Sequence, residues 1–143
     1  MIVHECDTAL IRHKKEKNYL YIKWRNYTLA SDYHRIADIK FSYMMKNNVK
    51  LLLSDITEQK VVAPAEQEYA RDRVINFHDS IGDYRHAIII NPRSIAAACA
   101  FSYKTMVNDA LNREIIRMFE SENDALQWLL HGTTRCISPG TVP

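Results

Sequence analysis

A chain of 143 residues is the size of one ordinary domain and is long enough to enclose a hydrophobic core. Hydrophobic residues make up 47% of the chain and charged residues 25%, which excludes a disordered protein. The formal net charge is only +2, and the one basic run, residues 13–17, is short and interrupted. We therefore expect no nucleic-acid partner.

The sequence also bears on cellular location. No stretch approaches the ~18 consecutive apolar residues that a bilayer span requires, so we expect no membrane span. Residues 1–7 include His4, Glu5 and Asp7 where a secretory signal needs a positive start and an apolar run. We expect a cytoplasmic protein whose three cysteines, Cys6, Cys99 and Cys136, are free thiols.

The N-terminal part predicts an antiparallel hairpin. Residues 2–13 form an extended but irregular segment, and residues 19–25 alternate strictly between two faces, with Trp24 on the apolar one. A short polar turn joins the two segments. Tyr19 and Tyr21 lie on the less apolar face, where they either cover the sheet beneath a helix or form a dimer patch.

A helix and a buried strand follow. Ser31 or Asp32 is the predicted cap of a helix that runs to about residue 47 or 48. Its inner stripe has helical spacing and consists of Tyr33, Ile36, Ala37, Phe41 and Met44. Residues 49–55 are a short apolar run ending in Ser54 and Asp55, which is typical of a strand covered on both faces.

A second helix is expected from Pro64 to Gly82, because proline suits a first helical turn and glycine suits a helix end. Residues 86–90 then form another buried strand. Asn91 is the predicted cap of a third helix, whose small residues 95–100 allow close approach to a neighbouring element.

The last strand is predicted over residues 114–119. Ser121 begins a capping-box pattern for a final helix that stops at Gly132. The element order β-β-α-β-α-β-α-β-α therefore predicts a single α/β domain over residues 1–132, followed by an irregular tail over residues 133–143. Helical crossovers between apolar strands require a mixed, mostly parallel sheet with helices on both faces.

The sequence shows no catalytic signature. The chain has only three glycines, so it contains neither a glycine-rich phosphate-binding loop nor a dinucleotide-binding fingerprint. A Gly-x-Ser-x-Gly elbow is also absent. His4 and Cys6 form at most half of a metal site, and His78 fits a core-edge histidine better than a general base. Cys136, in the tail, is the thiol that we expect to react. We expect no catalytic residue, metal or cofactor, and a binding role is favoured over an enzymatic one.

One edge of the predicted sheet has a physical reason to bind something. In open α/β sheets, ligands favour the carboxyl ends of parallel strands, where helix N-termini present free N–H groups. The candidates for ligand or partner contact at this edge are Ser54, Asp55, Thr57, Asn91 and Arg93. Helix capping and turn formation also account for these side chains, so both interpretations stay open.

The order of elements resembles the STAS domain, the SpoIIAA-like fold of bacterial anti-sigma-factor antagonists. The resemblance covers about residues 1–132. It rests on order and pattern in five places: the hairpin strand 19–24, the strand 49–55, the Ala63-Pro64 helix entry, the strand 88–90, and the closing segment from Phe119 to Leu129.

The resemblance implies a non-enzymatic regulatory or protein-interaction module, for which a homodimer is one form of interaction. The antagonists carry a serine at the start of the helix after their third strand, where phosphorylation disrupts docking. This chain has Ala63-Pro64-Ala65 near that helix start, and neither Ser54 nor Thr57 matches the position. The phosphorylation switch is therefore not carried over.

A related branch of similar fold suggests the alternative, a small-molecule or lipid-binding domain. There an apolar ligand would lie between a helix and the sheet, lined by Met44, Met45 and the region of Phe101.

Overall fold

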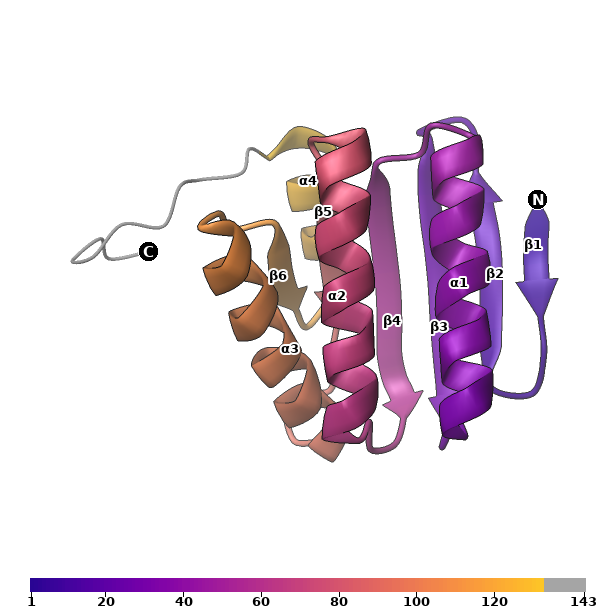
Figure 1. The fold of residues 1–143 in the computed structure, drawn as a ribbon, viewed down its shortest axis with the longest axis vertical. Helices are drawn as coiled ribbons and strands as arrows, with labels where there is room; N and C mark the ends of the chain where they lie inside the picture. The colour runs from indigo at the N-terminus through magenta and orange to yellow at the C-terminus, as the bar shows by residue number, and fades with distance from the viewer. Residues whose placement is uncertain (133–143) are drawn as a thin grey trace.

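The computed structural model of the protein describes residues 1–132. Within these residues six strands form one sheet in which the strands lie side by side in chain order (Figure 1). They are β1 (Ile2–Glu5), β2 (Ala9–Lys14), β3 (Tyr19–Asn26), β4 (Leu51–Gln59), β5 (Arg85–Ile89) and β6 (Ile116–Phe119). The pairs β1–β2 and β2–β3 are antiparallel, and the remaining pairs from β3 to β6 are parallel. The mixed, mostly parallel sheet expected from the sequence is confirmed.

Helices cover the sheet unequally. The helices α1 (Ala30–Lys46), α2 (Pro64–Ile81) and α3 (Ile95–Leu111) lie side by side on one face, and α4 (Glu122–His131) lies behind the sheet on the other (Figure 1). The larger core cluster fills the space beneath the first three helices. The smaller one joins Trp128 and Leu129 of α4 to Leu53, Ala87 and Ile89 of the sheet. Helices on both faces, as predicted, are therefore confirmed.

The N-terminal segment holds one strand more than the sequence indicated. The irregularity predicted within residues 2–13 is a turn at Asp7 and Thr8, where the Cys6 N–H donates to the Ala9 carbonyl at 2.9 Å. It divides the segment into β1 and β2. Tyr19 is buried in the cluster with α4, whereas Tyr21 is half-buried beside it.

Strand β4 extends four residues beyond its predicted end. Its continuation pairs with β3 past a register shift, which brings Arg25 opposite Glu58 and Asn26 opposite Gln59. Asp55 and Thr57 therefore lie within a strand, not in the loop that follows it.

Two of the four helix starts differ from the sequence prediction. The cap of α1 is Leu29, which makes no side-chain capping bond, so Ser31 and Asp32 lie inside the first turn. The cap of α3 is Ser94, whose Oγ accepts from the Ala97 N–H, because a turn that begins at Asn91 precedes the helix.

The other predicted helix boundaries are confirmed. Pro64 begins α2, and Gly82 ends it with a φ of 66° that favours glycine. Ser121 caps α4 by accepting from the Asp124 N–H. The predicted tail and Cys136 lie outside the described residues.

Candidate functional site

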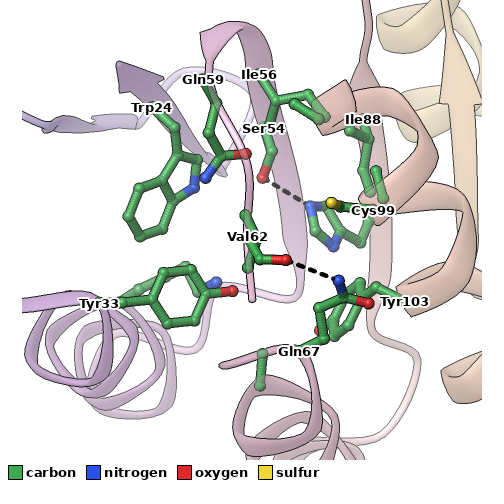
Figure 2. Close-up of a pocket in the computed structure, with 15 residues that line it drawn as sticks. Trp24, Tyr33, Ser54, Ile56, Gln59, Val62, Gln67, Ile88, Cys99 and Tyr103 are labelled. Atoms are coloured by element: carbon green, nitrogen blue, oxygen red, sulfur yellow. Dashed lines mark hydrogen bonds between the residues drawn. The ribbon is translucent and has the colours of Figure 1, made fainter. Parts of the chain in front are cut away.

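The candidate site is a cavity of about 60 Å³ between the sheet and the helices α1, α2 and α3 (Figure 2). Its floor comes from β3, β4 and β5, and its roof from the three helices. The polar side chains that line it are Tyr33 and Lys40 of α1, Ser54 and Gln59 of β4, Gln67 of α2, His86 of β5, and Cys99 and Tyr103 of α3. Seven positions contribute only hydrophobic or aromatic surface beside them: Trp24, Ile56, Val62, Ala70, Ile88, Ala96 and Ala100.

A serine and a histidine meet on the floor of this cavity. In the parallel register Leu52 pairs with His86, so Ser54, two residues further along β4, shares a face of the sheet with that histidine. The Ser54 Oγ lies 2.7 Å from His86 Nε2 (Figure 2). Only 3% of Ser54 and 5% of His86 is exposed. The bond therefore fixes the imidazole ring inside the protein.

The other nitrogen of His86 is the unusual feature. Its Nδ1 is buried and has no hydrogen-bond partner within residues 1–132. Burial, and then the nearby charge of Lys40, lowers the pKa of His86 well below its ordinary value. The ring is therefore neutral at neutral pH, with one nitrogen as donor and the other as acceptor.

Lys40 approaches the cavity from α1. It is 6% exposed and lies among Ile36, Phe41 and Met44, all of which are buried. Its Nζ lies 4.4 Å from the centre of the Phe41 ring, and no carboxylate of the described chain forms an ion pair with it. Burial lowers the pKa of Lys40 to about 8. A cation enclosed without a counter-ion is costly, so its retention needs a reason.

Two tyrosines complete the polar lining. Burial raises the pKa of Tyr33 and of Tyr103, so both stay neutral and keep a hydroxyl donor. The Tyr33 ring stacks on Trp24 with 5.1 Å between ring centres, which positions it beside the cavity (Figure 2). The Gln67 amide donates to the Val62 carbonyl at 3.0 Å and so ties the segment after β4 to α2.

The Ser54–His86 pair has the spacing of a nucleophile and its base, but the rest of such a site is not there. In a hydrolytic triad a carboxylate orients the second histidine nitrogen. Here that nitrogen is unpaired, and no acidic side chain of the described residues lines the cavity. The low pKa of His86 further weakens it as a base. The arrangement is suited to holding a polar ligand.

The structure separates the five candidates that the sequence indicated. Ser54 lies in the cavity. Asp55 points to the opposite face of β4, where its Oδ1 accepts from the Thr57 N–H at 2.9 Å and from the Thr57 hydroxyl at 2.7 Å. Asn91 accepts from the Arg93 N–H at 3.2 Å within the turn before α3. These four residues do not line the cavity.

Lys40 and His86, the two residues that define the site, were missed in the sequence. A signal existed for Lys40, because it falls within the apolar stripe of its helix at the spacing 36, 37, 40, 41, 44. His86 alternates with Ile88 in a strand that reads as buried, where a histidine needs a partner. His78 is half-buried on α2 and does not line the cavity.

The lining expected for an apolar ligand is not found. Met44 is fully buried in the core, whereas Met45 is 45% exposed and Phe101 is 57% exposed. None of the three lines the cavity.

Within residues 1–132 no three His, Cys, Asp or Glu side chains gather in a way that could hold a metal ion. No helix in that range has both the length and the apolar character needed to cross a membrane.

Comparison with known proteins identifies the fold. No family model matches the chain, and no curated protein matches it. Among solved structures, it is similar to an uncharacterized protein of the DUF3478 family from Shewanella loihica PV-4, described as having a SpoIIAA-like fold. The similarity has a TM-score of 0.58 at 20% identity and covers 88% of this chain and 97% of the other. It confirms the predicted architecture: this protein has a SpoIIAA-like, STAS-type α/β fold.

Proposed function

We propose that this protein is a non-enzymatic binding module that holds a small polar ligand in its interior cavity. The observation that carries the proposal is that two unpartnered groups line one cavity: Lys40, a buried lysine with no ion pair in the described chain, and His86, whose buried Nδ1 has no hydrogen-bond partner there. A buried polar group without a partner costs about 1–3 kcal/mol, and more if it is charged. A ligand that bonds to both groups removes that cost.

The position of the cavity supports the same function. It lies beneath the three helices that follow parallel strands, and Trp24, Gln59 and Ile88 line it from the ends of those strands, the region of α/β sheets in which ligands commonly bind.

This function is the small-molecule alternative that the sequence left open. The SpoIIAA-like fold supports a regulatory role for the module, in which ligand occupancy would be the regulated state. The cytoplasmic location inferred from the sequence remains part of this proposal.

Native mass spectrometry of freshly purified protein tests the proposal. We expect the wild-type chain to carry an extra mass that is lost on denaturation. A Cys99→Phe variant should be bare, because Cys99 lines the cavity and the larger ring fills it. The matched control is Ser102→Phe, at an exposed position of the same helix, which should retain the mass.

Two results would contradict this proposal. One is a wild-type chain that is bare when freshly purified. The other is a Cys99→Phe variant that is folded by circular dichroism and yet carries the same mass as the wild type.

A second function, protein interaction, is supported by the outer surface of α3. Ile95 is 69% exposed and Phe101 is 57% exposed, and Ala98 lies exposed between them at helical spacing. Exposed apolar residues that share one helix face are typical of a contact surface. If the protein forms a homodimer through this face, Phe101→Glu should convert the dimer to a monomer. Light scattering measures the change in mass. A wild-type protein that is monomeric at high concentration would contradict the homodimer.

A further inference from the structure

The charges around the cavity indicate the chemical class of its ligand. Lys40 is its one formally cationic lining residue, and no aspartate or glutamate among the described residues lines it. The remaining ionisable groups that face the cavity are His86 from β5, Tyr33 from α1, and Cys99 and Tyr103 from α3. The adjoining positions on β4 and α2 are uncharged, with Ser54 and Gln67. The described lining of the cavity therefore carries one cationic side chain and no anionic one.

We propose that the cavity binds a small organic carboxylate, which pairs with the Lys40 ammonium and accepts a hydrogen bond from His86 Nδ1. The inference rests on the proposed function and adds the class of ligand to it. A carboxylate is acceptor-only and carries the charge that Lys40 lacks as a partner.

In this proposal, the Ser54–His86 bond sets which nitrogen of His86 carries the proton that is donated to the carboxylate. When the Ser54 hydroxyl donates to Nε2 across 2.7 Å, the ring proton must lie on Nδ1. The unpaired nitrogen is then a donor, which a carboxylate oxygen satisfies. The hydroxyl groups of Tyr33 and Tyr103, which also line the cavity, are further hydrogen-bond donors.

The size and the apolar lining limit the rest of the ligand. A volume of about 60 Å³ accommodates a few water molecules or a carboxylate with a short carbon chain. Apolar side chains such as Ile56, Val62 and Ala96 supply the surface against which a short chain would pack.

The test uses butyrate as the probe and its uncharged analogue butyramide as the control, each titrated into ligand-free protein and followed by two-dimensional NMR. We expect butyrate to move the amide signals of Ser54 and His86 and to bind at least about tenfold more tightly than butyramide, a difference of about 1.4 kcal/mol. Lys40→Met should weaken butyrate binding at least about tenfold. Lys46→Met, at an exposed position of the same helix, should leave it unchanged.

The pH dependence of butyrate affinity distinguishes a lysine that binds the ligand from a lysine with only a structural role. With the pKa of Lys40 at about 8, most of its charge is lost by about pH 9.5, so butyrate affinity should fall by about tenfold or more between about pH 7 and 9.5. Affinity that is independent of pH, or equal for butyrate and butyramide, would overturn the inference.

A long-chain carboxylate, decanoate, separates a small free acid from the head of a lipid. Tighter binding of decanoate, lost in Lys40→Met, would overturn the short-chain ligand in favour of a fatty acid. If neither acid binds while native mass spectrometry still finds a retained mass that Cys99→Phe abolishes, the carboxylate inference fails and the proposed function stands.

Discussion

Lys40 occupies a position that packing alone would give to a leucine or a methionine. It lies in the buried stripe of α1, and its ammonium contacts the Phe41 ring at 4.4 Å in place of a carboxylate. Cation–π contact returns only part of the hydration energy that burial removes. We therefore expect the residue to lower the stability of the ligand-free protein, and the proposed binding function would account for its presence.

The first prediction concerns the stability cost of Lys40. Its pKa is lowered from 10.5 to about 8, so between these values the unfolded chain holds a proton that the folded chain has lost. The free energy of unfolding should therefore rise with pH from about 8 to about 10.5, by up to about 3 kcal/mol. Chemical denaturation of ligand-free protein across this range measures the rise.

Substitution of Lys40 shows how much of the rise in the free energy of unfolding with pH is due to this residue. Lys40→Met should be more stable than the wild type at about pH 7, by up to about 3 kcal/mol, and the difference should shrink as the pH rises. Lys46→Met, on the exposed side of α1, should change stability by less than about 0.5 kcal/mol. A Lys40→Met protein less stable than the wild type at neutral pH would contradict this account of Lys40.

The second prediction concerns Ser54, which provides the one hydrogen bond of the His86 imidazole ring inside residues 1–132. Ser54→Ala leaves both imidazole nitrogens without a partner, so the free energy of unfolding should fall by about 1–3 kcal/mol. Ser42→Ala, at an exposed position of α1, is the control and should cost less than about 0.5 kcal/mol. Equal stability of the two variants by urea denaturation would show that the buried bond does not stabilise the fold.

Among the helices and strands, the helix starts show when a sequence pattern is sufficient to predict the capping residue. Only Glu120 separates Ser121 from its strand, so the first residue with a typical capping side chain is also the cap. Before α3 two candidates compete, and Asn91 is used for a turn because its Oδ1 accepts from the Arg93 N–H. Ser94 then caps the helix. Spacing alone does not decide between two such residues, since both conformations satisfy local hydrogen bonds.

The third prediction tests these assignments. Ser94→Ala should lower the free energy of unfolding by about 1 kcal/mol, because it removes the 3.0 Å bond from the Ala97 N–H. Ser31→Ala should have almost no effect, since Ser31 lies inside the first turn of α1 and not at its cap. Thermal unfolding of the two variants measures the difference. A larger loss for Ser31→Ala than for Ser94→Ala would reverse the assignment.

Strand β4 shows what the sequence could not indicate. Its final residues, Thr57 to Gln59, include polar and exposed side chains, which are typical of a loop. They form a strand because β3 continues alongside them, and the side chain of Lys23 pairs with Glu58 across the two strands. Such pairing depends on tertiary structure and leaves no local pattern.

For the whole molecule, the fold was predictable and the cavity was not. Alternating and helical periodicities, with helical crossovers between apolar strands, limit the topology to an α/β sheet covered on both faces. The cavity instead requires Lys40, Ser54 and His86, separated along the chain, to meet beneath three packed helices. No spacing in the sequence encodes that meeting, although each residue interrupts an otherwise apolar pattern.

The unequal covering of the sheet also determines where the cavity lies. The single helix α4 closes a small apolar cluster, whereas the layer of α1, α2 and α3 encloses both the larger core and the cavity. A ligand held there contacts side chains from all three helices of that layer. Its presence would therefore stabilise the packing of the layer as a unit.

The most direct test of the central claim is a crystal structure of freshly purified protein, examined for electron density between Lys40 and His86. The account predicts density for a molecule larger than water that lies within hydrogen-bonding distance of both Lys40 Nζ and His86 Nδ1. A cavity closed by its own side chains, or filled only by water that bonds to these two groups, would contradict it.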